Sequence, residues 1–273
     1  AVLRAAAHAE LDIADAHAVA AALRDFAPQL VINAGAFTRV DDAERAPEAA
    51  ARANSIGPQV LAAACRACGA WLAHVSTDFV FDGRQSHPYD AAARPNPLSV
   101  YGRTKLDGEG AVLRELPGRS TVVRASWVYS AGGGFAVRML ALMKSRPQLS
   151  VVSDQVGAPT CASGLAQVLW ALGERRTPGL WHWCDSGVAS WYDFAVAIAE
   201  EALRLGLLSS APGIAPIGTA EYPTPAVRPQ YSVLDKRPTE KLLGRCAPHW
   251  RTALRETLAS LTPGAAAGAG ARA

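Results

Sequence analysis

Three short apolar runs, separated by segments of helical length, limit what this chain can fold into. They are residues 30–33 (LVIN), 71–76 (WLAHVS) and 121–125 (TVVRA). A continuous apolar run of four to six residues is typical of a strand that is buried on both faces. Strands that alternate with helices form parallel βαβ units. The sequence therefore predicts an α/β fold built on a doubly wound parallel sheet.

Helical spacing and end signals predict the segments between and after these runs. Asp15 is a candidate N-cap for a helix over 15–26, and Gly69 is a candidate stop for a long alanine-rich helix over 44–67. The other predicted helices are 99–116, 135–144, 164–172, 191–205 with Ser190 as its cap, 239–243 and 250–261, and further strands are expected at 149–152 and 180–184. Residues 82–97 are rich in turn formers and are expected to form a loop, whereas residues 208–229, with many Gly, Pro, Thr and Ser, are typical of chain that lines a binding cleft.

Composition excludes several classes of protein. The 273 residues carry a formal charge of only +3, which does not suggest nucleic-acid binding. The five cysteines are odd in number and scattered, so a secreted disulfide framework is not expected, and Cys65 and Cys68 are expected to be an ordinary helical pair. No apolar run is long enough for a membrane span, and no signal peptide is visible. The expected location is the cytoplasm.

The most informative residues follow the second apolar run. Ser76, Thr77 and Asp78 come at its end, and 24 residues after Thr77 a Tyr-x-x-x-Lys motif, Tyr101 and Lys105, begins a helix. Ligands of open α/β sheets bind beyond the carboxyl ends of the strands. Residues four apart share one face of a helix, so Tyr101 and Lys105 point the same way. A lysine ammonium favours the phenolate and would lower the pKa of Tyr101 toward neutrality, which would make it a proton shuttle.

These stretches resemble a known family. The sequence STDFVFDG (76–83) followed by P-x-x-x-Y-G-x-x-K (97–105) resembles the extended short-chain dehydrogenase/reductases, and more narrowly the dTDP-4-dehydrorhamnose reductase family. Five further stretches support the narrower resemblance: LDIAD (11–15), VINAGAFTRVD (31–41), RASWVY (124–129), DQVGAPT (154–160) and RPQYSVLD (228–235).

The resemblance implies a Rossmann-type sheet, an activity and a set of site residues. The activity is reduction of the 4-keto group of dTDP-4-dehydro-L-rhamnose by NADPH or NADH, with Tyr101, Lys105 and Thr77 as catalytic residues. Tyr101 would protonate the C4 oxygen, and Lys105 would bind the nicotinamide ribose. The expected cofactor-binding residues are Asp12, Ile13, Gly35, Ala36, Phe37, Thr38, Val75, Tyr101 and Lys105, and the expected substrate-binding residues are Thr77, Asp78, Trp127, Gln155 and Arg228.

Some of these roles have structural alternatives. Asp12 could cap a turn, Trp127 could be a core aromatic, and Gln155 and Arg228 could make structural hydrogen bonds. The string Trp181, His182 and Trp183 is expected to pack within a strand. The resemblance also allows a Mg²⁺ ion and a homodimer, but no residue pattern supplies metal ligands.

The implied domain organisation follows the family. Residues 1–150 are expected to form the dinucleotide-binding domain, with 151–185 returning to it. Residues 186–262 are expected to form mainly a smaller substrate-binding lobe, and the low-complexity residues 263–273 a disordered tail.

One departure from the family concerns the cofactor phosphates. A dinucleotide fold opens with a strand and a glycine-rich turn, and this sequence shows neither; roughly 25 to 30 residues are expected to be missing. This chain is therefore expected to bind the cofactor poorly and to fold poorly. The residue that selects NAD or NADP belongs to the same region, where Arg4 is the visible candidate for a 2′-phosphate.

Two alternatives to the reductase remain open. The first is a non-catalytic nucleotide-sugar-binding or NADP-binding regulatory protein on the same scaffold, which the missing turn favours and the intact Tyr-Lys pair opposes. The second is another short-chain sugar-nucleotide reductase, epimerase or dehydratase. A dehydratase commonly has Asp-Glu after the threonine, whereas this chain has Asp78-Phe79.

Overall fold

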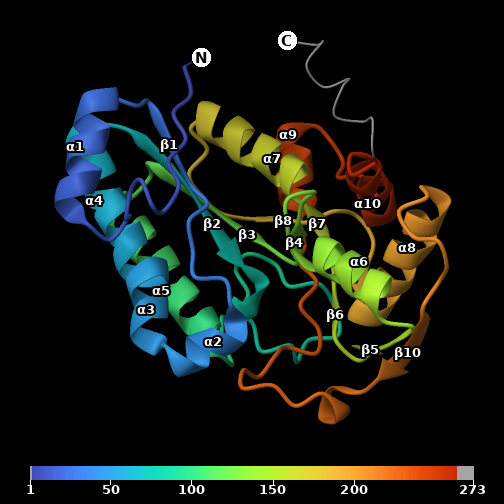
Figure 1. Cartoon of the computed structure of the whole chain (residues 1–273). Helices are drawn as coiled ribbons and strands as arrows, with labels where there is room; N and C mark the ends of the chain where they lie inside the picture. Colours follow the sequence, from blue (N-terminus) through green and yellow to red (C-terminus); the bar gives the residue numbers. More distant parts are fainter. Residues whose placement is uncertain (1, 263–273) are drawn as a thin grey trace.

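The core of the protein is a four-stranded parallel sheet. The computed structural model describes residues 2–262. The strands are β1 (Leu30–Asn33), β2 (Trp71–Thr77), β3 (Ser120–Ala125) and β8 (Gly179–Trp183), and they lie in the order β1-β2-β3-β8 (Figure 1). All three pairings are parallel. The predicted α/β fold with a parallel sheet is confirmed.

Helices cover both faces of this sheet, as a doubly wound fold requires. α4 (Gly57–Cys68) and α5 (Val100–Glu115) lie on one face, with α1 (Ala16–Phe26) packed against α4, and α7 (Ala162–Glu174) lies on the other face (Figure 1). Side chains alternate between the faces because the strand period is two. Leu72 and Val122 pack toward α4 and α5, whereas Ala73 and Val123 pack toward α7. By the same alternation, His74 and Arg124 lie on the α5 side.

Capping residues set most helix ends where the sequence predicted them. Asp15 caps α1 by accepting hydrogen bonds from two backbone amides, and Gly69 ends α4 in the left-handed conformation. Ser99 caps α5, and Ser190 forms a capping box with Asp193 at α8 (Trp191–Arg204).

The single helix predicted over 44–67 is wrong. The structure has α2 (Val40–Arg45), α3 (Pro47–Ala51), a π-helical segment η1 (Arg52–Ile56) and then α4. Pro58 lacks the N–H that would bond to the carbonyl of Asn54 four residues earlier. The π-helical segment η1 lies at this point, and such wider turns occur as local insertions within α-helices. The helix therefore changes register at Asn54.

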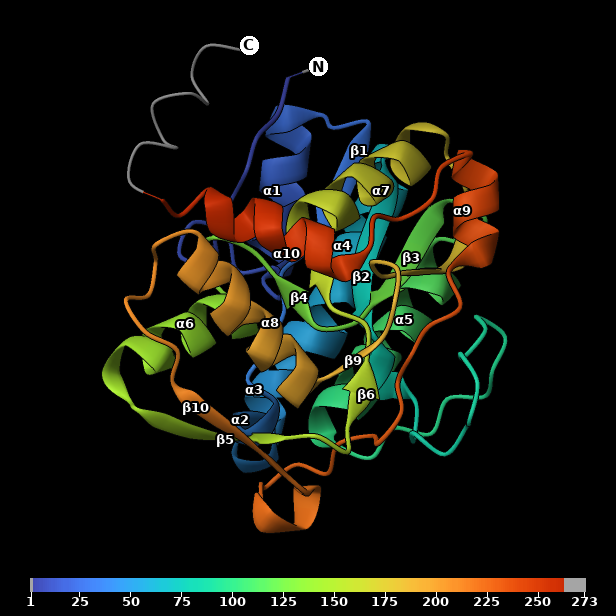
Figure 2. The same cartoon turned by 90° about the vertical axis from the view of Figure 1, so that its right-hand side faces the viewer.

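A second lobe packs around α8 (Figure 2). α6 (Phe135–Ser145), α8 and α10 (Trp250–Ala259) share one hydrophobic core. Beside them, β5 (Gln148–Val152) pairs in parallel with β10 (Gly213–Ile217). The remaining elements are β4 (Val128–Tyr129), β6 (Val156–Gly157), β7 (Thr160–Cys161), β9 (Ala189–Ser190), α9 (Arg237–Leu243) and the short 3₁₀ turns η2 (Asp78–Val80) and η3 (Thr219–Glu221). β10 lies within residues 208–229, where the sequence predicts no strand, because its internal Pro216 leaves no clear strand signal.

The predicted domain boundaries stay predictions. The packing places α6 and β5, which precede residue 152, with α8 and β10 of the second lobe. The predicted tail, residues 263–273, lies outside the described residues. Among the described helices, none is both long and apolar enough to cross a membrane.

Candidate active site

The candidate catalytic residues meet where β2 ends and α5 begins. Thr77 is the last residue of β2, and Tyr101 and Lys105 lie in the first two turns of α5. Gly102 allows α5 to approach this closely, because a Cβ at that position would lie 2.3 Å from the Phe79 carbonyl oxygen. The ring of Phe79 also packs edge-on against Tyr101, with 5.7 Å between centroids. The structure therefore brings the three predicted catalytic residues to one sheet edge.

Lys105 is buried and bonded to the strand. Its Nζ donates a hydrogen bond to the Val75 carbonyl oxygen at 2.6 Å. Burial lowers the pKa of Lys105 to about 8, and the nearby Glu109 carboxylate opposes that decrease. An ammonium group can donate three hydrogen bonds, so two remain available for a ligand at this edge.

Tyr101 is held as a protonated phenol. Burial raises the pKa of Tyr101 to about 12, the Thr77 hydroxyl opposes the increase, and the Asp78 carboxylate adds to it. This direction is opposite to the decrease expected from the Tyr-Lys pairing, because the effect of burial dominates. A protonated phenol is the form that can donate a proton to a carbonyl oxygen.

Thr77 and Asp78 are tied into the protein. The Thr77 hydroxyl donates to the Asp78 carboxylate at 3.1 Å and accepts from the Phe79 amide at 3.2 Å. Asp78 also accepts a 2.5 Å hydrogen bond from the Ser232 hydroxyl, 154 positions later in the chain. Burial raises the pKa of Asp78 to about 7, against the hydrogen bonds of Ser232 and Thr77, which lower it. Asp78 thus links the sheet edge to the segment around Ser232, whose backbone bonds to β6.

The expected cofactor stretch lies beyond the end of β1. Asn33 ends this strand, and its side-chain oxygen accepts from the Gly35 amide at 3.0 Å. The buried Asn54 holds Phe37 through both backbone groups, at 2.8 Å and 3.1 Å, and donates to the Thr104 hydroxyl of α5 at 3.1 Å. Asn54 therefore positions residues 36–38 against α5. The sequence interpretation missed it, because no spacing rule places a residue of a π-helical segment.

Asp12 and Ile13 lie beside this stretch. The Asp12 carboxylate pairs with Arg52 at 2.7 Å and caps its own turn by accepting from the Ala14 amide at 2.9 Å. Ile13 lies against Gly35 and Gly57, where a Cβ would come within 3.6 Å and 2.6 Å of its side chain.

Lys105 and the residues that follow β1 fit the nicotinamide end of a dinucleotide. The fit rests on the free donors of the buried Lys105, the glycine at position 35 and the open strand ends of a parallel sheet. Within residues 2–262, no strand and glycine-rich turn precede β1, so no phosphate contacts are assigned.

The other three expected substrate residues, Trp127, Gln155 and Arg228, make protein contacts around the second lobe. Trp127 has a positive φ of 49° and stacks on Trp191, with 3.5 Å between ring centroids. Gln155 donates to the Thr219 hydroxyl at 3.0 Å and accepts from the Trp191 indole at 3.2 Å. A salt bridge of 2.7 Å joins the Arg228 guanidinium to Asp41 of α2. We call Trp127, Gln155 and Arg228, together with these partners, the wall of the second lobe. In β8, Trp183 and His182 are buried as predicted.

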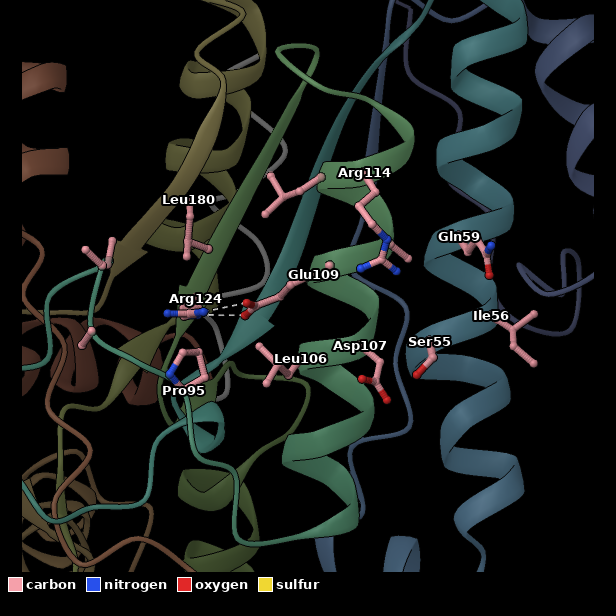
Figure 3. Close-up of a pocket in the computed structure, with 16 residues that line it drawn as sticks. Ser55, Ile56, Gln59, Pro95, Leu106, Asp107, Glu109, Arg114, Arg124 and Leu180 are labelled. Carbon is pink, nitrogen blue, oxygen red and sulfur yellow. Dashed lines mark hydrogen bonds and ion pairs between the residues drawn. The ribbon is translucent and has the colours of Figure 1, made fainter.

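A cavity of about 640 Å³ lies beside α5, and its lining includes Glu109 of α5 and Arg124 of β3 (Figure 3). Leu106, Gly110 and Leu113 line it from α5, and Ser55 and Gln59 line it from the neighbouring helical segment. Tyr101 and Lys105 are not among its lining residues. The catalytic geometry rather than this cavity therefore defines the candidate site.

Metal ligands and cysteines add nothing to the site. Among residues 2–262, no three His, Cys, Asp or Glu side chains lie close enough to hold a metal ion, so the Mg²⁺ ion that the resemblance allowed has no assigned ligands. Cys65 and Cys68 are free thiols on α4, which agrees with the predicted helical pair. The homodimer and the cytoplasmic location remain predictions.

Comparison with known proteins identifies the family. Residues 1–262 match the family described as RmlD substrate binding domain. The dTDP-4-dehydrorhamnose reductase of Escherichia coli K12 is 38% identical over 256 residues, covering 92% of this chain and 85% of the relative. A crystal structure of a dTDP-4-dehydrorhamnose reductase from Clostridium acetobutylicum superimposes with a TM-score of 0.85 at 38% identity, covering 92% of this chain and 87% of that one. The Bacillus anthracis reductase, solved in complex with NADP, gives a TM-score of 0.85 at 32% identity, covering 92% and 87% of the two chains. The chain therefore belongs to the dTDP-4-dehydrorhamnose reductase family.

Proposed function

We propose that this protein reduces the 4-keto group of dTDP-4-dehydro-L-rhamnose to give dTDP-L-rhamnose. The observation that carries the proposal is the convergence of Thr77, Tyr101 and Lys105 at the carboxyl end of β2. NADPH is the proposed reductant, because the Bacillus anthracis relative binds NADP, and NADH is the alternative. The proposed place of action is the cytoplasm.

The protein groups have distinct roles in this reaction. A bound reduced nicotinamide supplies the hydride for C4. Tyr101 donates its phenolic proton to the C4 oxygen, which carries negative charge as the carbonyl is reduced. Thr77 donates a hydrogen bond to the same oxygen after exchanging its bond to Asp78. The Lys105 ammonium binds the nicotinamide ribose and stabilises the phenolate that remains, since opposite charges favour the ionised form.

Binding roles follow from position. Asp12, Ile13, Gly35, Ala36, Phe37, Thr38 and Val75 are proposed to line the cofactor. Asp78, Trp127, Gln155 and Arg228 are proposed to line the nucleotide-sugar. The Trp127–Trp191 stack offers a flat apolar surface, and Gln155 fixes its tilt through the Trp191 indole.

The test is NADPH oxidation, followed optically, with dTDP-4-dehydro-L-rhamnose. It is run on this chain and on a chain extended upstream by a strand and a glycine-rich turn. Turnover that disappears in Tyr101→Phe would support the proposal. An extended chain that is folded and binds NADPH, yet gives no turnover, would exclude the reductase and favour the non-catalytic regulatory alternative.

A further inference from the structure

A buried ion pair lies directly behind the catalytic residues. Arg124 of β3 donates through Nε and Nη2 to the two carboxylate oxygens of Glu109, at 2.8 Å and 2.7 Å. Both residues are 2% exposed. Burying two charges removes them from water, and the pair often stabilises a fold no better than apolar side chains would. Stability alone therefore does not explain why Glu109 and Arg124 are buried as charges.

Glu109 contacts the strand as well as Arg124. Its Oε1 also accepts a 2.5 Å hydrogen bond from the Ser76 hydroxyl of β2. Ser76 lies between Val75, whose carbonyl binds Lys105, and the catalytic candidate Thr77. Glu109 itself lies one helical turn after Lys105 on the same face of α5. One carboxylate thus joins the end of β2 to the helix that carries Tyr101 and Lys105.

The other groups around Lys105 do not supply the negative charge that the Glu109 carboxylate supplies. His74 of β2 faces Lys105, and burial together with the Lys105 charge lowers the pKa of His74. The amide of Asn33 lies 3.0 Å from His74 Nδ1, and its oxygen is already bonded to the Gly35 amide. The Asn33 NH₂ therefore donates to Nδ1, which requires a neutral ring with its proton on Nε2.

Glu109 is thus the negative charge that acts on Lys105. Burial lowers the pKa of this lysine, and Glu109 is the group that raises it. Arg124 of β3 is committed to Glu109, and the remaining acid of the site, Asp78, lies near Tyr101 beyond Thr77. Figure 3 shows Glu109 pointing from α5 toward Arg124, while Asp107 points to the other side of the helix, near Ser55.

We propose that Glu109, aligned by Arg124 and Ser76, is a positioning residue that keeps the Lys105 ammonium charged and fixes the end of β2 against α5. The proposal rests on the proposed reductase function for its catalytic meaning. Its electrostatic content concerns this chain alone, so it can be tested without turnover.

The test is a pH titration of the lysine side chains by NMR. The chain has four lysines, Lys105, Lys144, Lys236 and Lys241, so ¹³Cε labelling gives a simple spectrum in which Lys105→Arg assigns the signal. In Glu109→Gln, the amide keeps the shape and a hydrogen-bond acceptor but removes the charge. The Lys105 midpoint is expected to fall by about one pH unit.

Two further variants separate this effect from general damage. Glu109→Gln leaves Arg124 buried without its partner, so the double variant Glu109→Gln/Arg124→Met removes both charges; it is expected to fold and to lower the Lys105 midpoint by a smaller amount. Asp107→Asn removes an exposed carboxylate from the same helix and is expected to leave the midpoint unchanged.

The outcomes are distinct. A Lys105 midpoint that stays at its original value in the folded double variant would overturn the inference. A shift in the double variant that Asp107→Asn reproduces would also overturn it, because the effect would then be general to the helix. In an active enzyme, the alkaline limb of kcat/KM would move with the midpoint. If the wild-type chain binds NADPH without turnover, but the Lys105 midpoint still falls in the Glu109 variants, the reductase would be refuted and the role of Glu109 retained.

Discussion

The sheet edge at β2 and the wall of the second lobe are built in opposite ways. At the edge, Thr77, Tyr101 and Lys105 come from two adjacent elements, and the Thr77 hydroxyl and the Lys105 ammonium are hydrogen-bonded to groups within residues 75–79. In the lobe, Gln155 and Arg228 are bonded to protein side chains from distant segments. These hydrogen bonds at the edge therefore fall within one βα unit, whereas those of the wall join segments far apart in the sequence. Substitutions should show this difference.

The largest effect is expected at the edge. Tyr101→Phe removes the hydroxyl that donates the proton, and kcat should fall by about 100-fold or more, which is typical for loss of a general acid. NADPH affinity, measured by fluorescence, should change little because the ring remains. Tyr192→Phe on α8 is the matched control and should retain activity. Equal losses in both variants would contradict a local role for Tyr101.

The next effect tests what supports the edge. Arg124→Met leaves the Glu109 carboxylate buried without its counter-charge, so the free energy of unfolding should fall by about 3–5 kcal/mol. Arg251→Met breaks the exposed pair with Glu200 in the lobe and should cost less than about 1 kcal/mol. Urea denaturation measures both. Similar losses of unfolding free energy in the two variants would mean that breaking the buried pair costs no more than breaking the exposed one.

A third prediction concerns Asp78, which links the edge to Ser232. Its pKa is raised from an ordinary value of 3.8 to about 7, mainly by burial. The folded state thus holds a proton that the unfolded state releases, so this group destabilises the fold progressively as pH rises from about 4 to 7, at up to about 1.4 kcal/mol per pH unit. Asp78→Asn removes the penalty.

The measurement is urea denaturation of the wild type and Asp78→Asn at several pH values. Between pH 4 and 7, the unfolding free energy of the wild type should fall relative to that of Asp78→Asn. Above pH 7, the difference between the two should be constant. A difference that is independent of pH would show that Asp78 ionises as freely in the folded chain as in the unfolded one.

The same contrast explains what the sequence could predict. β2, α5 and the Tyr-Lys pair follow from local patterns: an apolar run, a helical segment over 99–116 and a four-residue spacing. Asn54 could not be found, because Pro58 shifts the helix register into a π turn. The contact of Arg228 with Asp41 spans 187 positions, and no local pattern encodes it. β10 was missed because its pairing with β5 overrides the turn-forming composition of its segment.

The smallest effect distinguishes two roles for Arg228, whose salt bridge to Asp41 closes the wall against α2. The pKa of Asp41 is lowered, and although burial opposes this, the Arg228 guanidinium is the main cause of the decrease. A lowered pKa means that the pair stabilises the fold above the ordinary carboxyl pKa, and that this contribution disappears as pH falls through the folded value. Both side chains are partly exposed, so Asp41→Asn should cost only about 0.5–1 kcal/mol at pH 7.

The substrate KM then decides between the two roles. If Arg228 contacts the nucleotide-sugar, Asp41→Asn leaves the guanidinium free for it, so KM should stay equal or fall, whereas Arg228→Met should raise it. If Arg228 only closes the wall, both variants should lose the same small stability and change KM equally. The second result would remove Arg228 from the proposed substrate residues and leave the lobe to recognise substrate through Trp127 and Gln155.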